Sequence, residues 1–450
     1  MQQESLKRDL SFTQAVALNM IDMVGIGPFV VLPLVIGIMG GPQHIAAWIA
    51  GAILALIDGF IWAEFGAAMP KAGGSYVFLR ESFGPRWGKL MSFLFIWQTM
   101  IQAPLVIASG SIGFAQYLSY LLPLDDVTRR VASGTLVIVL TFILYRKIST
   151  IGKISVALWI GVMGTMAWFI IGGLSHFDPK LAFSYPDGAW DFTWAFWVAL
   201  GQGTVKTMYS YLGYYNVNHL GGEIKNPEKN IPRAIFISII GIAILYLAMQ
   251  FAVIGVIPWQ EAKDSQFIVS TLIERLYGTA AAAVATVLVL WIAFASLFAV
   301  MLGYSRIPYA AALDGNFFSV MGKIHPTKKF PHISLLWLGG AAFVFSLLFR
   351  LSDVISAILA MRILVQFIGG AVGVMILRNR IGKEHLPFKM WLYPLPALIA
   401  IVLWFSIMLS TGWKFALSGL GMTLLGIIVY FIREQLQKKI DFPSVLRKNL

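Results

Sequence analysis

The 450-residue chain contains no cysteine, which excludes disulfide bonds and thiolate chemistry. Charged residues are scarce as well: they make up 12% of the sequence, whereas soluble globular proteins have roughly 25%. A Walker phosphate-binding loop, zinc-ligand spacing and a nucleophile elbow are also missing from the sequence. The polar residues are too scattered to form a catalytic cluster. We therefore expect no enzyme activity, no bound metal, no cofactor, and no soluble globular domain.

Apolar residues are abundant, at 58% of the sequence. Apolar runs of about 20 residues recur from one end of the chain to the other, and each is long enough to cross a bilayer. The sequence therefore predicts an all-α polytopic membrane protein with about 12 transmembrane helices. The predicted spans are residues 12–38, 45–69, 88–118, 129–146, 152–174, 192–219, 233–257, 279–305, 333–350, 353–377, 390–409 and 413–432.

The net charge of +13 is distributed in a way that indicates topology. Of the 34 lysines and arginines, 24 fall in the even-numbered connections and the two terminal segments, and 7 fall in the odd-numbered connections. Positively charged loops stay on the cytoplasmic side of a membrane. We therefore expect an integral protein of the cell (inner) membrane with both termini in the cytoplasm. The same distribution argues against a nucleic-acid partner.

The first predicted span contains an unusual stretch, Asn19–Pro33, with Gly25, Gly27 and Pro28 close together. Glycine weakens a helix and proline removes an amide donor. A membrane helix is broken only where the freed backbone groups face a cavity or other protein. This stretch is either a simple proline kink or a place where a polar ligand meets bare backbone.

The sixth predicted span has a similar stretch, Leu200–Leu220, rich in glycine, hydroxyl and amide side chains. Two interrupted helices at corresponding places of two halves indicate a transporter built from inverted repeats. We therefore expect two five-helix repeats with interrupted helices 1 and 6, followed by two further helices. The expected units are residues 12–174, residues 192–377, helices 11 and 12 in residues 390–432, and a basic cytoplasmic tail in residues 433–450.

Five motifs in register resemble those of the amino acid–polyamine–organocation (APC) transporters. They are Val24–Phe29, similar to the family's Ile-Gly-Ser-Gly-Ile-Phe; Pro70–Tyr76, similar to Pro-x-x-Gly-Gly-x-Tyr; Ser210–Tyr214, similar to Phe-Ala-Tyr-x-Gly-Trp; Gly222–Pro227, similar to Gly-Glu-x-x-Asn-Pro; and Arg306–Gly315, similar to Arg-x-x-x-x-x-Ala-x-Asp-Gly. The chain departs from the family pattern at Ile26, Pro28 and Tyr214. The resemblance implies the inverted-repeat fold of the leucine transporter type.

A break in each of two helices creates a binding site for a zwitterion. The outer half of span one begins near Gly27, and its amides suit a carboxylate. The outer half of span six ends near residues 209–212, and its carbonyls suit an ammonium group. We expect the carboxylate to be held by Gly25, Ile26 and Gly27. We expect the amine to be held by the carbonyls of Tyr209, Ser210 and Tyr211 together with Met23, with Leu212 and Gly213 completing the gap. The resemblance favours an aromatic gate near Tyr211, and the alternative for this ring is ordinary helix packing.

Three residues are candidates for coupling. Lys153 matches the position at which many sodium-independent APC relatives place an ammonium where sodium binds in others, between spans one and eight; Ser296 is its candidate partner. The alternative is a lysine that snorkels to the membrane surface. Asp22, a carboxylate inside a span, is expected to take a proton, pair with Lys206 or receive a cationic substrate group.

Three other ionisable residues inside the spans, Asp58, Glu64 and Arg362, are interpreted as helix-to-helix or interfacial pairs. Glu223 and Arg233 are interpreted as parts of an inner gate.

The predicted function is secondary transport of amino acids by alternating access, independent of sodium, with proton symport, exchange and uniport left open. The closest alternative is a transporter of polyamines or other organic amines, because Asp22 is available to an extra amine. A non-transporting amino acid sensor is a more distant alternative. The expected partners are a small amino acid or amine and the lipid bilayer, and the sequence does not indicate an oligomeric state.

Overall fold

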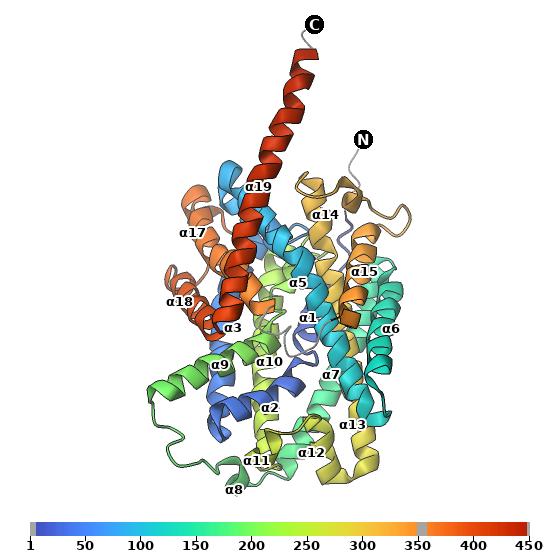
Figure 1. Ribbon diagram of the computed structural model, residues 1–450, viewed down its shortest axis with the longest axis vertical. Coiled ribbons are helices and arrows are strands. Elements are labelled where there is room, and N and C mark those ends of the chain that lie inside the picture. The colour runs from blue at the N-terminus through green and yellow to red at the C-terminus, as the bar shows by residue number, and fades with distance from the viewer. Residues whose placement is uncertain (1–5, 349–357, 448–450) are drawn as a thin grey trace.

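The computed structural model describes residues 6–348 and 358–447. These residues form helices joined by loops, and they contain no β-strand (Figure 1). The long helices are α1 (Phe12–Met23), α2 (Gly27–Met39), α3 (Ile45–Ala68), α5 (Gly84–Leu121), α6 (Asp126–Leu144), α7 (Ile148–Ser175), α9 (Trp194–Tyr211), α10 (Pro227–Ile254), α13 (Thr279–Tyr304), α15 (His332–Leu348), α17 (Gly369–Ile381), α18 (Leu395–Ser410) and α19 (Trp413–Arg447). The shorter helices are α4 (Ser75–Ser82), α8 (Pro179–Ala182), α11 (Trp259–Ala262), α12 (Ile268–Tyr277) and α14 (Arg306–Leu313).

Each predicted span coincides with one of these helices or with an interrupted helix. Among the described residues, eight helices are long and apolar enough to cross a membrane, and the bent pair α1 and α2 makes a ninth. Helices α15 and α18 are shorter but also apolar. The prediction of an all-α polytopic membrane protein is therefore confirmed. The ends of predicted spans nine and ten at residues 349–357, and the last three residues of the predicted tail, lie outside the described part of the chain.

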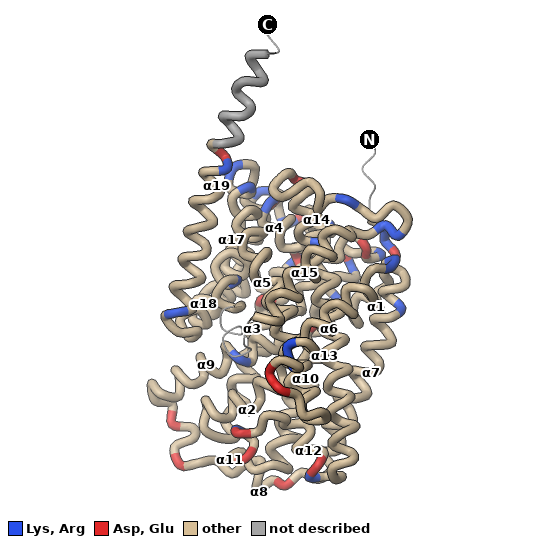
Figure 2. The backbone as a smooth tube through the Cα atoms, turned by 45° about the vertical axis from the view of Figure 1, so that its right-hand side comes forward, with Lys and Arg blue, Asp and Glu red and all other residues tan. Residues whose placement is uncertain are grey.

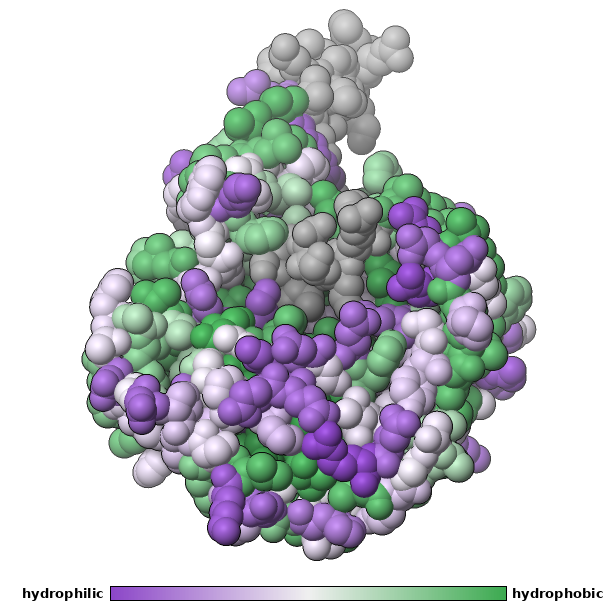
Figure 3. All heavy atoms as spheres, turned by 60° about the horizontal axis from the view of Figure 1, so that its bottom comes forward, coloured by the Kyte–Doolittle hydropathy of each residue, from purple (hydrophilic) through white to green (hydrophobic). Residues whose placement is uncertain are grey.

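Both ends of the described chain lie at one end of the helix bundle, which we call the terminal end. Lysine and arginine side chains gather there, whereas aspartate and glutamate are the more frequent charges at the opposite end (Figure 2). Figure 3 shows that opposite end, where hydrophilic residues run across the face and hydrophobic residues lie at its margins. The charge pattern of the sequence is thus a real asymmetry between the two ends of the molecule.

The helices form two closely packed groups that meet at the middle of the bundle. In one group α3 packs against α9 and α10, and α1 packs against α10. In the other group α5, α6, α13 and α15 pack against one another. Helix α1 also contacts α13, so the break in the first span lies where the two groups meet.

Buried polar side chains join the outer helices to the first group. Asp58 of α3 accepts hydrogen bonds from Trp62, at 2.5 Å, from the hydroxyl of Tyr214, at 2.6 Å, and from Trp404 of α18, at 3.0 Å. Glu64 of α3 makes a two-pronged ion pair with Arg378 of α17, with both N–O distances at 2.5 Å. These contacts agree with the interpretation of Asp58 and Glu64 as helix-to-helix partners.

Candidate functional site

The first span is interrupted between α1 and α2, whose axes differ by 42°. Gly25 lies in the break, where a Cβ atom would be only 2.7 Å from the hydroxyl oxygen of Ser296 in α13. Pro28 has no amide hydrogen, and the amides of Phe29 and Val30 both donate to the carbonyl of Ile26, at 3.2 Å. Amides that have no partner at the N-terminus of a helix attract an anion.

The amides that remain open at this break belong to two of the three predicted residues. The Gly25 amide donates to the Met23 carbonyl at 3.1 Å. Among the backbone hydrogen bonds of the described residues, none uses the amides of Ile26 and Gly27. The break therefore presents two neighbouring N–H donors, those of Ile26 and Gly27, which are the second and third of the three predicted residues.

The sixth span is interrupted after Tyr211, where α9 ends and the chain unwinds before the short 3₁₀ helix η2 (Asn216–His219). Gly213 occupies this unwound segment with φ of +121°, a conformation that L side chains rarely adopt. A Cβ atom at Gly213 would also lie 2.8 Å from a carboxylate oxygen of Asp22. Glycine is thus required here both by the backbone and by the closeness of α1.

A tyrosine from α10 connects the two interruptions. The hydroxyl of Tyr246 donates to the carbonyl of Met23 at 2.7 Å and is 3.2 Å from the carbonyl of Ser210. Tyr246 is fully buried, so these contacts lie inside the bundle. The Met23 and Ser210 carbonyls therefore share one hydroxyl donor. The Met23 oxygen also accepts from the Gly25 amide, so of the two it is the Ser210 oxygen that keeps a lone pair for a ligand.

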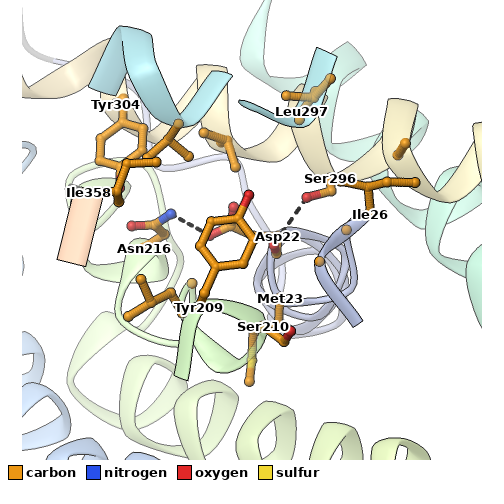
Figure 4. Close-up of a pocket in the computed structure, with 18 of the residues that line it drawn as sticks. Asp22, Met23, Ile26, Tyr209, Ser210, Asn216, Ser296, Leu297, Tyr304 and Ile358 are labelled. Atoms are coloured by element: carbon orange, nitrogen blue, oxygen red, sulfur yellow. Dashed lines mark hydrogen bonds between the residues drawn. The ribbon is translucent and has the colours of Figure 1, made fainter. Parts of the chain in front are cut away.

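Asp22 lies at the centre of the site, as Figure 4 shows. One of its carboxylate oxygens accepts a hydrogen bond from the side-chain amide of Asn216, in the unwound part of the sixth span. Its main-chain carbonyl accepts a hydrogen bond from Ser296 at 3.2 Å. The other carboxylate oxygen is buried and has no hydrogen-bond partner among the described residues. Asp22 therefore joins both interruptions to α13 and keeps one oxygen available.

A cavity of about 620 Å³, including the part open to solvent, lies between these elements. Its polar lining residues include Asp22, Ser210, Tyr215, Asn216, Tyr304 and Arg362. Its apolar lining residues include Ile26, Val106, Ala293, Leu297, Val300 and Ile358. The ring of Tyr209 also lines the cavity, and its hydroxyl lies 3.0 Å from the hydroxyl of Ser109. The cavity therefore offers both polar groups and apolar surface to a ligand.

Arg362 is a cavity residue that the sequence interpretation missed. It is 3% exposed, and it donates hydrogen bonds to the hydroxyls of Tyr215 and Tyr304. Its guanidinium carbon also lies 5.5 Å and 5.1 Å from the centres of the same two rings. It directly precedes the π-helix η4 (Ile363–Ile368), a helix form that is frequent at functional sites. The cavity thus contains a buried cation as well as the carboxylate of Asp22.

Most of the predicted site residues lie on the cavity. Seven of the eight predicted substrate contacts line it, together with the coupling candidates Asp22 and Ser296; the seven are Met23, Gly25, Ile26, Gly27, Tyr209, Ser210 and Gly213. Tyr211 does not line the cavity. Its ring packs against Trp48, at 6.1 Å, and against Tyr246, at 5.3 Å between ring centres, and the expected gate near Tyr211 stays a prediction. The aromatic side chain at the cavity is that of Tyr209.

Lys153 lies next to a close approach of its helix to α1. A Cβ atom at its neighbour Gly152 would lie 2.8 Å from the side chain of Gln14, so Gly152 faces α1. Lys153 itself is exposed, and among the described residues it forms no hydrogen bond or ion pair with α1 or α13. Ser296, its predicted partner, donates to the main-chain carbonyl of Asp22.

A buried ion pair lies at the terminal end of the bundle. Glu223 and Arg306 form a two-pronged ion pair with N–O distances of 2.8 and 2.9 Å, and both side chains are almost fully buried, at 0% and 2% exposed. Leu10, just before α1, pairs with the backbone on either side of Ile224 through two hydrogen bonds of 2.9 Å. Glu223 is thus paired with Arg306, and its part in an inner gate stays a prediction.

The fold and the site together define a class of protein, the membrane carriers in which two interrupted helices surround a central cavity. Comparison with known proteins gives the family. The sequence model of the amino acid permease family matches residues 10–432, and the chain belongs to that family. The APC assignment made from the motifs is thereby confirmed.

Three relatives are similar over most of their length. A serine/threonine exchanger of Bacillus subtilis (strain 168) is 26% identical over 90% of this chain and 91% of its own. The cystine/glutamate transporter of Homo sapiens is 27% identical, over 95% and 85%. An aspartate–proton symporter of Bacillus subtilis is 26% identical, over 89% and 79%. The family and its members are transporters and not enzymes, and amino acid transport is the general function that they support.

Proposed function

We propose that this protein carries a zwitterionic α-amino acid across the cell membrane by alternating access, without sodium, and that its termini are cytoplasmic. The observation that carries the proposal is the pairing of the two interruptions across one cavity. The Ile26 and Gly27 amides present donors for a carboxylate, and the Ser210 carbonyl presents an acceptor for an amine. The apolar residues of the cavity lining would receive the side chain.

Asp22, rather than Lys153, is the coupling residue in this proposal. Its carboxylate faces the cavity, joins both interruptions and has one unpartnered oxygen, whereas Lys153 is exposed. A carboxylate inside a membrane span commonly marks a proton pathway. Relatives named as a proton symporter and as an exchanger support coupling of one of these two kinds.

An organic amine or polyamine is the second candidate substrate, because Asp22 would attract an additional ammonium group. The buried guanidinium of Arg362, which also lines the cavity, weighs against a polyamine, since its positive charge repels a dication. The substrate panel described next separates the two candidates.

The first experiment is thermal unfolding of the purified protein with a panel of amino acids and polyamines. A ligand at a hundredfold excess over its Kd stabilises the folded state by about 2.7 kcal/mol. We expect stabilisation by one set of amino acids and none by polyamines. Stabilisation by polyamines alone would favour the second candidate and overturn the first.

Flux measurements in proteoliposomes test the mechanism. We expect saturable uptake and counterflow of the stabilising amino acid, unchanged when sodium is replaced by choline at constant membrane potential. Binding without counterflow would identify a sensor instead of a carrier. Loss of uptake in choline would contradict sodium independence while leaving the substrate assignment intact.

A further inference from the structure

An apolar groove lies on the outside of the bundle between α6 and α15, which pack side by side (Figure 1). It has a volume of about 880 Å³, including the part open to its surroundings, and is lined by Ile138, Thr141, Phe142, Tyr145, Leu336, Gly339, Gly340 and Phe343. The hydroxyl of Thr141 donates to the Val137 carbonyl of its own helix at 2.8 Å. Apart from Tyr145 at its end, the groove therefore offers only hydrocarbon surface to a ligand.

Two adjacent glycines of α15 create the shape of the groove. A Cβ atom at Gly339 would collide with the side chain of Thr141, so this glycine allows α6 and α15 to approach closely. A Cβ atom at Gly340 would have nothing within 4 Å, so this glycine leaves the floor of the groove open. Phe142, 75% exposed, and Leu336, 49% exposed, stand at the groove. The open space is thus a gap between protruding apolar side chains.

The groove ends at a basic cluster at the terminal end of the bundle. Tyr145 closes the groove, and Lys328 lies over its ring with Nζ 4.5 Å from the ring centre. Lys328 also donates to the main-chain carbonyl of Tyr145 at 2.9 Å. The next two residues along the chain, Arg146 and Lys147, are both exposed. Three cations therefore lie near the closed end of the groove: Lys328 packs on Tyr145, and Arg146 and Lys147 follow Tyr145 in the chain.

The length of the groove fits the geometry of a membrane leaflet. From Tyr145 to Ile138 the α6 helix rises by about 10 Å, at about 1.5 Å per residue. A leaflet contributes about 15 Å to the hydrocarbon core of a bilayer. With Tyr145 and its cations at the level of the lipid headgroups, the groove extends over roughly two thirds of that depth. Basic pockets between membrane helices at this level bind anionic headgroups.

We propose that the groove between α6 and α15 is a binding site for an anionic glycerophospholipid. One acyl chain lies along α6 and α15 over Gly340, and the phosphate lies beside Lys328 and Arg146. A sterol or an uncharged hydrophobic molecule would use the apolar surface but not the cations. The site is independent of the transport cavity, because both helices contribute to it through their outward faces.

The test compares two exposed glycines, Gly340 and Gly164 of α7, since a Cβ atom meets nothing within 4 Å at either position. Gly340→Leu fills the groove, and Gly164→Leu adds the same side chain to another helix. Each purified variant is titrated with phosphatidylglycerol or phosphatidylcholine of identical acyl chains in mixed detergent micelles. Thermal unfolding and the lipid retained in native mass spectra are measured.

We expect phosphatidylglycerol to raise the unfolding temperature of the parent protein and of Gly164→Leu, and to do so at least about tenfold less potently for Gly340→Leu. A charge variant, Lys328→Gln with Arg146→Gln, tests the headgroup while all the lining residues of the groove keep their identity. It should respond equally to the two lipids. Lys263→Gln, which removes a lysine that lies 5.9 Å from the ring centre of Trp259, is its matched control and should keep the preference for phosphatidylglycerol.

Equal responses of Gly340→Leu and Gly164→Leu would overturn the proposed site, as would equal stabilisation of the parent protein by both lipids. If Gly340→Leu does not yield folded protein, the charge variant decides alone. A preference for phosphatidylglycerol that persists in the charge variant would show that the anionic lipid binds elsewhere. None of these outcomes depends on the identity of the transported substrate.

Discussion

Gly25 is tightly constrained, because its α-carbon lies against Ser296 of α13. In Gly25→Ala the new methyl group would lie 2.7 Å from the Ser296 hydroxyl oxygen and 3.2 Å from its Cβ atom. We expect uptake to fall by roughly tenfold or more, since displacements of about 1 Å at a functional site have effects of this size or larger.

The double variant Gly25→Ala with Ser296→Ala is the control for this prediction. It removes the closer of the two contacts, and we expect part of the uptake to return. A double variant no better than Gly25→Ala would show that the contact with the Ser296 hydroxyl is not what excludes a side chain at this position.

Asp22 carries the prediction about proton coupling. Asp22→Asn keeps the size of the side chain and an oxygen that accepts from Asn216, but it cannot gain or lose a proton. We expect accumulation driven by a pH gradient to be lost while counterflow and thermal stabilisation by the substrate remain. Asp126→Asn, at a carboxylate that is 88% exposed, is the matched control and should accumulate substrate normally. Gradient-driven accumulation by Asp22→Asn would remove Asp22 from the coupling step.

At the residue scale, the sequence could predict backbone features better than side-chain directions. Gly25 and Gly213 lie where the two spans are interrupted, and glycines that weaken a helix are visible without a structure. The direction of a side chain depends on how its helix is rotated. Tyr209 and Tyr211 illustrate this, since only Tyr209 lines the cavity. The place of Arg362 on the cavity could not be predicted for the same reason, because nothing in the sequence shows which face of its helix meets the cavity.

At the scale of elements, the ion pair between Glu223 and Arg306 joins the unwound end of the sixth span to α14. Removing one partner of a buried pair leaves an uncompensated charge and costs about 3–5 kcal/mol. We therefore expect Glu223→Gln to lower the free energy of unfolding by about that amount. The measurement is chemical or thermal unfolding in detergent.

A second pair of the same residue types provides the control. Arg275 and Glu261 also make two contacts, at 2.7 and 2.8 Å, but their side chains are 40% and 46% exposed. Exposed pairs contribute about 0–1 kcal/mol, so Glu261→Gln should have little effect. Equal destabilisation by the two variants would contradict the idea that burial gives the first pair its importance.

The helices themselves were predictable because each apolar run has the length of a bilayer. The predicted first span, residues 12–38, corresponds to α1 and α2, which together cover Phe12–Met39. The π-helix η4 was not predictable, because its sequence is as apolar as that of an ordinary α-helix. Its wider turn depends on packing that the sequence does not record.

At the scale of the whole molecule, the distribution of charge predicts the orientation in the membrane. Because the chain has no cysteine, a single introduced cysteine is a unique label. Lys383→Cys lies at the terminal end and Asp187→Cys on the opposite side, and both positions are exposed. We expect an impermeant maleimide to label Asp187→Cys in intact cells, and Lys383→Cys only after lysis. The reverse pattern would invert the proposed topology.

The division into two inverted repeats remains a prediction at this scale. It rests on the interruptions in spans one and six, and the packing of α1 beside the unwound segment after α9 is consistent with it. The membership of the family, by contrast, could be predicted from five short motifs, because they lie in register along most of the chain.

The contact of one phenol with two carbonyls has a consequence for stereochemistry. Tyr246 holds the Met23 and Ser210 oxygens at a fixed separation before any ligand arrives. An amino acid held by the Ser210 carbonyl and by the Ile26 and Gly27 amides would have two of the four bonds of its α-carbon fixed in space. Its mirror image, held in the same way, would exchange the positions of the side chain and the hydrogen, so the two side chains would meet different residues of the cavity lining. The carrier should therefore distinguish mirror-image substrates by the rigidity of its backbone, even where their side chains are the same.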